Sequence, residues 1–317
     1  MRYTVLGKAG FEVSSLSLGA SALGGVFGEV DEARCIETVH TALDHGINYI
    51  DVSPAYGATR AEVMLGRALR GVDRARYRLS TKVGKTMPGG PMKPSVFDFR
   101  REAILRSLDE SRARIGVEYF DIIHLHDIEY EGGRHIDIAL GEGLETLLEL
   151  KAAGAIGAVS VGTYPIDLCR RIIENYPVDT ILVHNHYQLN DTLLEDLIPV
   201  AAERNVGLIN ASPFAMGLLG DREPPAWHPA NADERALFAR ARDFCRERGT
   251  SLSKLALQFA TQHPGIPTTL FSTSRPEAVL QNIAWHEEPC PRDLVAEVQA
   301  ILAPVLNRDW DFANTVG

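Results

Sequence analysis

One stretch indicates the fold of this sequence: Asn48-Tyr49-Ile50-Asp51-Val52-Ser53-Pro54-Ala55-Tyr56-Gly57. In it, a short apolar run ends at a carboxylate and leads into a loop that contains a phenol. Two later stretches have the same design. Residues 78–84 pass through a lysine, and residues 119–127 end in a histidine and an aspartate. If these runs are neighbouring parallel strands, the side chains at their ends meet at one edge of a sheet. Those side chains are Asp51, Tyr56, Lys82 and His126.

Strand and helix patterns alternate outward from these runs, with a repeat of roughly 30 residues. We predict strands at residues 15–18, 48–52, 77–82, 120–125, 155–161, 180–185, 207–210 and 268–271. We predict helices at residues 31–45, 60–70, 98–115, 138–153, 166–175, 193–203, 233–248 and 276–285. Strand–helix units of this number, with no linker between them, predict an α/β fold of the (β/α)₈ TIM barrel type.

The whole chain, residues 1–317, is expected to form a single barrel domain. An N-terminal β-hairpin is predicted around the turn at residues 7–10, and an extra C-terminal helix at residues 292–306. The loop at residues 216–231 is rich in proline and glycine and follows the seventh strand. Such a loop either covers a ligand or is a passive insertion.

Composition narrows the class of protein and of partner. The formal net charge of −10 disfavours nucleic acid and anionic membranes as partners. The four cysteines, Cys35, Cys169, Cys245 and Cys290, lack zinc-type spacing and are expected to be free thiols. The first residues lack the apolar core of a signal peptide, and no run of about 18 apolar residues suggests a membrane span. We therefore expect a cytoplasmic protein that binds a small molecule; no pattern indicates its oligomeric state.

A phenol beside an ammonium and an imidazole is suited to proton transfer. A phenol has an ordinary pKa near 10, and lowering it to near neutrality corresponds to about 3–4 kcal/mol. One ammonium about 4 Å away supplies about 4 kcal/mol at an effective dielectric near 20, so Lys82 is expected to suffice for Tyr56. Asp51 would keep Lys82 charged. His126 would donate a hydrogen bond to the substrate oxygen, while a cofactor takes a hydride.

Two different functions compete with this interpretation. The histidines at strand ends suggest a metal-dependent barrel hydrolase, with His124, His126, His184 and His186 as candidate ligands. We expect His124 and His126 to face opposite sides of their strand, with one packed against the outer helices, which disfavours this function. A regulatory protein that binds nucleotide without turnover is the second competitor, and the complete set of four residues disfavours it.

The sequence resembles the aldo-keto reductase superfamily. The resemblance lies in residues 48–57, Glu62, Leu65-Gly66, residues 80–82, residues 121–126 and Ser212-Pro213, and it covers essentially the whole chain. Residues 51–59, 124–129, 211–219 and 224–230 are most similar to L-galactose dehydrogenases and related bacterial sugar 1-dehydrogenases. The resemblance implies that Tyr56 is the acid/base, assisted by Lys82, Asp51 and His126.

The resemblance also implies a nicotinamide cofactor lying across the barrel mouth. The implied cofactor contacts are Gly162, Thr163, His184, Ser212, Phe214, Met216, Gly217, Leu218, Ser272, Ser274, Arg275, Gln281 and Asn282. The Lys and Arg that hold the 2′-phosphate of NADP in many relatives fall on Ser272 and Ala278. Loss of two cations weakens an anion site, so we predict NAD, with NADP possible through Arg275.

The substrate implied by this likeness is a cyclic sugar. Oxidation of the C1 hemiacetal hydroxyl of an aldose of the L-galactose or L-fucose type would give a lactone. Oxidation of another cyclic hemiacetal such as pyridoxal and NADPH-dependent reduction of an aldehyde are the alternatives. The residues predicted to border the substrate are Ser21, Phe27, Trp227 and His228. Trp227 and His228 either contact a sugar ring or anchor their loop.

Overall fold

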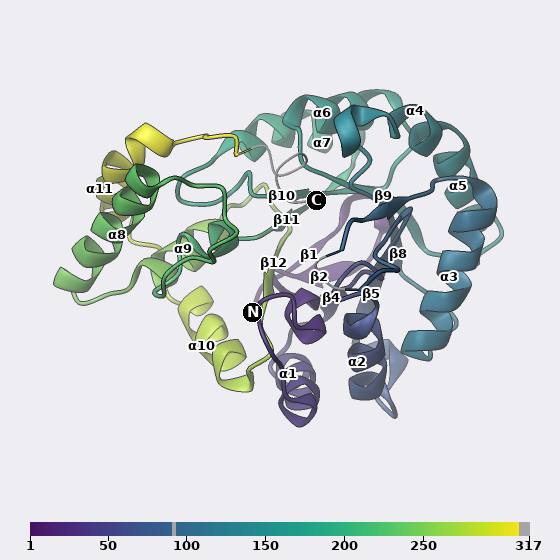
Figure 1. Cartoon of the computed structure of the whole chain (residues 1–317), viewed down its shortest axis with the longest axis horizontal. Helices are drawn as coiled ribbons and strands as arrows, with labels where there is room; N and C mark the ends of the chain where they lie inside the picture. The colour runs from purple at the N-terminus through teal and green to yellow at the C-terminus, as the bar shows by residue number, and fades with distance from the viewer. Residues whose placement is uncertain (91–92, 311–317) are drawn as a thin grey trace.

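The computed structural model describes residues 1–90 and 93–310 and contains a closed barrel of parallel strands. The strands are β3 (Leu16–Gly19), β4 (Tyr49–Asp51), β5 (Arg78–Val83), β8 (Ile122–His126), β9 (Ala158–Thr163), β10 (Thr180–His184), β11 (Gly207–Ala211) and β12 (Thr268–Ser272). They pair in chain order, and β12 closes the barrel against β3. Helices surround the strands (Figure 1). The predicted (β/α)₈ TIM barrel is confirmed.

Alternation along each strand separates two apolar cores. Outward-facing side chains pack against the helices in one large cluster. A second, smaller cluster fills the N-terminal end of the barrel, and includes Tyr49, Ile122 and Leu182. The hairpin of β1 (Tyr3–Val5) and β2 (Glu12–Ser14) closes this end, because Leu6 and Val13 belong to the same inner cluster. The charged and imidazole side chains of Asp51, Lys82 and His126 lie toward the opposite, C-terminal end.

The helices of the barrel follow its strands. They are α1 (Glu32–Asp44), α2 (Arg60–Leu69), α3 (Arg101–Ile115), α5 (Leu144–Ala152), α6 (Ile166–Asn175), α7 (Ile198–Arg204), α9 (Leu252–Thr261) and α10 (Pro276–Glu287). Local signals set several boundaries: the Asp31 side chain caps α1, and Gly116, with φ of 78°, ends α3. No helix among the described residues is long and apolar enough to cross a membrane.

Two further helices, α8 (Ala232–Glu247) and α11 (Arg292–Leu302), lie outside the barrel against each other (Figure 1). The sequence pattern predicts residues 233–248 as a helix of the barrel and does not predict α9, which is the helix that precedes β12. Every residue of α9 except Lys254 is buried, so α9 has no polar face to mark its period. The pattern also does not predict the short hairpin of β6 (Lys85–Thr86) and β7 (Val96–Phe97). Nor does it predict the one-turn helix α4 (Ile136–Ile138) and the π-helical turn at Ala139–Gly143 that follows it.

A buried ion pair joins α2 and α3 to the outer side of β5. Glu62 is fully buried, and it accepts hydrogen bonds from Thr81 Oγ1 at 2.7 Å and from Arg114 Nε at 2.6 Å. Removing one partner of a buried pair costs about 3–5 kcal/mol, because the other charge loses its compensation. We expect Glu62→Ala to lower the free energy of unfolding by about 3 kcal/mol, measured by urea denaturation.

The chain offers a matched control for this prediction. Glu110 also pairs with Arg114, at 3.4 Å, but its side chain is exposed. Exposed pairs contribute about 0–1 kcal/mol, so Glu110→Ala is expected to change the stability by less than about 1 kcal/mol. Equal losses in the two variants would contradict the role given to burial.

Candidate active site

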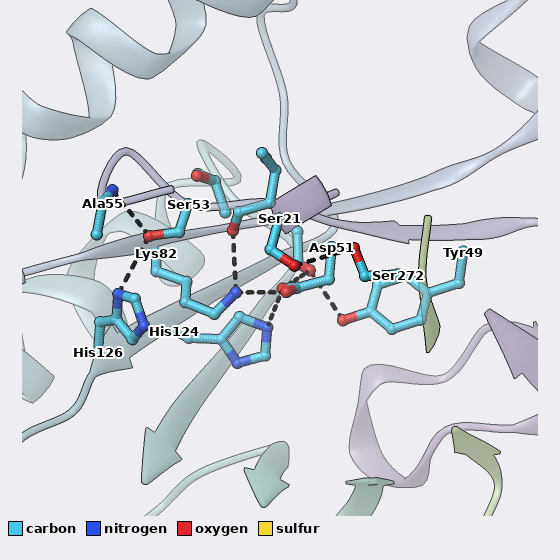
Figure 2. Close-up of polar contacts among 12 residues, drawn as sticks. Ser21, Tyr49, Asp51, Ser53, Ala55, Lys82, His124, His126 and Ser272 are labelled. Carbon is cyan, nitrogen blue, oxygen red and sulfur yellow. Dashed lines mark hydrogen bonds and ion pairs between the residues drawn. The ribbon is translucent and has the colours of Figure 1, made fainter. Parts of the chain in front are cut away.

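Three adjacent strands bring the predicted side chains to the inner face of the barrel at its C-terminal end. Asp51 is the last residue of β4, Lys82 lies near the end of β5, and His126 ends β8. All three are buried, and Tyr56 lies half-buried in the loop after β4. Figure 2 shows Lys82 directed at Asp51, with His124 and His126 nearby. The structure therefore brings the four residues together.

Lys82 is held by two groups. Its ammonium pairs with Asp51 Oδ2 and donates a hydrogen bond to the Val52 carbonyl at 3.0 Å (Figure 2). The other oxygen of Asp51 accepts a hydrogen bond from Ser80 Oγ at 2.7 Å. Burial disfavours the ammonium, but Asp51 and Tyr56 more than offset this and raise the pKa of Lys82 above its ordinary value. Lys82 therefore stays charged.

Tyr56 lies against Lys82 and His126. The Lys82 ammonium is 4.8 Å from the centroid of the phenol ring, and the imidazole of His126 meets that ring edge-on, with 6.0 Å between centroids. Burial raises the pKa of Tyr56 to about 12, although Lys82 opposes the rise. The expectation that Lys82 alone brings this pKa near neutrality is wrong, because it neglected the cost of burying a phenolate and the opposing charge of Asp51.

His126 is neutral at ordinary pH. Burial lowers its pKa to about 3, although Asp127 opposes the fall. Nδ1 of His126 lies 3.1 Å from Ser53 Oγ, and Nε2 lies 3.6 Å from Asp127 Oδ2. Lys85 Nζ pairs with the same carboxylate oxygen at 2.7 Å. A neutral imidazole in this position can donate a hydrogen bond to a substrate oxygen but cannot serve as a ready proton source.

His124 corrects one of our expectations. Residues two apart in a strand share a side, so His124 faces the barrel interior as His126 does. Its Nε2 lies 3.5 Å from Asp51 Oδ1 (Figure 2). Within residues 1–90 and 93–310, no group of three or more His, Cys, Asp or Glu is arranged to hold a metal ion. The geometry therefore gives the metal-dependent hydrolase no support.

The C-terminal mouth of the barrel also has small inward-facing residues, on strands other than those that carry Asp51, Lys82 and His126. Gly19, Gly162 and Ala211 stand near the ends of β3, β9 and β11, where larger side chains would fill the space. His184 ends β10 on the same inner face, and burial lowers its pKa to about 4. Thr163 turns the other way, and its hydroxyl donates to Glu129 at 2.6 Å.

The loop after β11 has an unusual backbone. Ser212, Met216 and Gly217 have φ values of 66°, 52° and 107°, a region that non-glycine residues seldom occupy. Backbone strain of this kind concentrates at binding sites. Phe214 and Met216 are half-buried beside it, whereas Leu218 is fully buried in the core and offers a ligand only its backbone.

The remaining candidate cofactor residues lie at the end of β12 and the start of α10. Ser272 Oγ accepts hydrogen bonds from Ser21 Oγ and from the Ala22 amide, both at 2.9 Å (Figure 2). Arg275 is exposed where α10 begins, and its side chain makes no capping hydrogen bond. Ser274 is half-buried, Gln281 exposed and Asn282 buried. A helix N-terminus with hydroxyls and one cation suits a phosphate, so this donor set fits a dinucleotide.

The four predicted substrate residues differ in accessibility. Phe27 is 55% exposed and Trp227 is 37% exposed, whereas Ser21 is half-buried. His228 is only 3% exposed, and its Nδ1 accepts a hydrogen bond from the Ala230 amide at 3.0 Å. His228 thus contributes to the fold of its own loop. The substrate roles of all four stay predictions.

Sequence reasoning missed three residues beside the site: Ser53, Lys85 and Asp127. Ser53 lies within the stretch that carries Asp51 and Tyr56, and Asp127 directly follows His126. The positions of these two residues in the sequence could have indicated that they lie near the site. The sequence does not indicate which side chains they contact. Lys85 comes from the unpredicted hairpin of β6 and β7.

A closed barrel with a buried lysine–aspartate pair, a tyrosine and a neutral histidine at its C-terminal end defines a barrel oxidoreductase. The sequence profile of the Aldo/keto reductase family matches residues 15–303, and the chain belongs to this family. It is 38% identical to an L-galactose dehydrogenase of Arabidopsis thaliana, over 96% of this chain and 95% of that protein. It is 31% identical to a pyridoxal 4-dehydrogenase of Microbacterium luteolum, over 90% of this chain and 93% of that one.

A solved structure agrees with the fold. The holo form of an aldo-keto reductase from Bacillus halodurans superposes with a TM-score of 0.78, covering 98% of this chain and 100% of that one at 24% identity. Family membership makes the protein an oxidoreductase that uses a nicotinamide cofactor.

Proposed function

We propose that the protein oxidises the C1 hydroxyl of a cyclic aldose, of the L-galactose or L-fucose type, to a lactone with NAD. The observation that carries this proposal is the contact of Tyr56 with both charged Lys82 and neutral His126 at the barrel mouth. The likeness to an L-galactose dehydrogenase over almost the whole chain supports the sugar substrate.

The chemistry follows from the protonation states of the side chains. His126 donates a hydrogen bond from Nε2 to the C1 oxygen and holds it beside the Tyr56 hydroxyl. Tyr56 is a phenol at neutral pH, and the small fraction that is phenolate accepts the proton of the C1 hydroxyl, so that the C–O bond becomes a carbonyl. Lys82 stabilises the phenolate. A bound oxidised nicotinamide would supply the acceptor for the hydride that leaves C1.

The test is the absorbance at 340 nm with purified protein, NAD or NADP, and a panel of aldoses together with pyridoxal. Rapid reduction of NAD with L-galactose or L-fucose is the expected result. Turnover of pyridoxal alone would keep the hemiacetal mechanism but change the substrate, an alternative that the pyridoxal 4-dehydrogenase relative favours. Turnover only of aldehydes with NADPH would replace the proposal with a reductase.

The preference for NAD can be tested at Ala278 in α10. Ser272 is engaged with Ser21 and Ala22, and Ala278 has no charge to offer a 2′-phosphate. A hydrogen bond to a charged group contributes about 1.5–3 kcal/mol, or roughly 10–100-fold in affinity. We expect Ala278→Arg to raise kcat/KM for NADP by about tenfold and to leave kcat/KM for NAD within about threefold.

The control adds the same charge elsewhere on the helix. Leu280 is an exposed residue of α10, and Leu280→Arg is expected to leave the ratio of the two kcat/KM values unchanged. A gain for NADP in both variants would indicate only a general effect of charge. No gain in Ala278→Arg would remove this residue from the cofactor preference.

We further propose that residues 1–317 act as one domain in the cytoplasm on a small molecule. The free state of the four cysteines is consistent with a reducing compartment, and the net charge of −10 disfavours a polyanionic partner.

A further inference from the structure

We propose that Ser53 is a positioning residue that fixes which nitrogen of His126 carries the proton, so that the imidazole presents Nε2–H to the substrate oxygen. The proposal rests on the proposed function, and it adds a residue outside the set of four to the machinery of that function.

The hydrogen bonds of Ser53 assign its proton. Ser53 is fully buried in the loop that leads to Tyr56, and its hydroxyl accepts a hydrogen bond from the Ala55 amide at 3.1 Å. A hydroxyl has one proton to donate. In the part of the chain that the structure describes, the only other partner of this hydroxyl is Nδ1 of His126, at 3.1 Å (Figure 2). If the hydroxyl instead accepted a proton from Nδ1 as well, its own buried proton would have no acceptor among the described residues, so we infer that the Ser53 proton points to the lone pair of Nδ1.

The other nitrogen of His126 indicates the same tautomer. Nε2 lies 3.6 Å from Oδ2 of Asp127, and a carboxylate can only accept. A lone pair on Nε2 would face that negative charge, whereas an N–H is attracted to it. Lys85 pairs with the same oxygen of Asp127 at 2.7 Å and holds the carboxylate in place. At 3.6 Å the Nε2–H does not form a full hydrogen bond with Asp127, so it stays available to a substrate.

The tautomer matters because His126 is neutral. Its low pKa leaves it with a single ring proton at working pH, and that proton can be on either nitrogen. With the proton on Nδ1, the ring would present a lone pair that repels the substrate oxygen once the hydroxyl proton has moved to Tyr56. With the proton on Nε2, the ring donates to that oxygen as charge moves during the reaction. Removing Ser53 leaves Nδ1 buried without its donor, so the Nδ1–H form becomes more favourable.

The experiment compares Ser53→Ala with Ser53→Thr, which keeps the hydroxyl. Long-range proton–nitrogen NMR of protein labelled with ¹⁵N-histidine reports the tautomer of His126, and the resonance is assigned by its loss in His126→Asn. We expect the Nε2–H form in the wild type and in Ser53→Thr, and a mixture with Nδ1–H in Ser53→Ala. We also expect kcat to fall by about tenfold in Ser53→Ala, with KM changed by less than about twofold.

Ser17→Ala is the matched control. Ser17 is also fully buried in the barrel wall, but it bonds with Ser14 and Thr268 near the opposite end. This variant is expected to keep the His126 tautomer and the wild-type kcat.

Two results would overturn the proposal: an unchanged tautomer in Ser53→Ala, or a changed tautomer with wild-type kcat. The NMR measurement needs no substrate, so it separates this inference from the proposed function. If the wild type oxidises or reduces nothing in the panel, the proposed function fails, and the tautomer of Ser53→Ala still decides whether Ser53 sets the proton position.

Discussion

Replacing Tyr56 with phenylalanine is expected to lower kcat by about 10³-fold, within the range of about 10²–10⁴ that a positioned acid/base contributes. The substitution removes the oxygen that, as a phenolate, accepts the proton of the substrate. It keeps the ring that packs against Lys82 and His126, so the fold and the cofactor site should persist. The measurements are kcat from the absorbance at 340 nm and the dissociation constant of the cofactor from fluorescence titration.

A control distinguishes lost chemistry from lost packing. Tyr77 is buried and lies just before β5, at the other end of the barrel from Tyr56. Tyr77→Phe is expected to keep kcat within about twofold, because its hydroxyl is far from the reacting atoms. Substantial turnover in Tyr56→Phe would show that another group moves the proton. A failure of that variant to bind cofactor would mean that it tests structure and not catalysis.

The fold was largely predictable because barrel strands are buried on both faces and appear in the sequence as apolar runs between polar helices. The helix α9 was not predictable in this way, since nearly all of its residues are buried and its sequence has no polar stripe. The amphipathic helix α8 gave a clearer pattern and was assigned in its place, although it packs outside against α11.

The sequence could predict that Asp51, Tyr56, Lys82 and His126 lie close together, because each is near the end of a strand or in the loop that follows it. Their electrostatics were not predictable, since the pKa of Tyr56 depends on how much protein surrounds its hydroxyl. The contact of Ser53 with His126 joins residues 73 positions apart, and no local pattern encodes it. The error at His124 had a simpler origin, because a strand repeats every two residues and His124 shares a face with His126.

Replacing Lys82 with methionine is expected to destabilise the fold and to shift the pH dependence of catalysis. Methionine leaves Asp51 buried without its partner, which costs about 3–5 kcal/mol in the free energy of unfolding. Lys82 also lowers the pKa of Tyr56, so its loss raises that pKa beyond about 12. Oxidation needs the phenolate, and kcat/KM should therefore rise with pH along a limb displaced to higher pH, with a loss of at least about 10²-fold at pH 8.

The double variant Asp51→Asn/Lys82→Met separates these two effects. Without a buried charge to compensate, it should recover most of the stability lost in Lys82→Met, because a buried pair can be replaced by neutral groups at little cost. It cannot restore the field that favours the phenolate, so the displaced pH profile should remain. Recovery of both properties would assign Lys82 a purely structural role.

The pH range of this experiment is limited by the fold itself. The pKa of Tyr56 is about 10 in an unfolded chain and about 12 in the folded protein, so above pH 10 the unfolded state binds fewer protons. The contribution of Tyr56 to stability is complete below pH 10 and is lost as the pH rises toward 12. The profiles should therefore be measured from pH 6 to pH 10, where the wild type and the variant both rise without a plateau and the displacement appears as a lower kcat/KM of the variant at every pH.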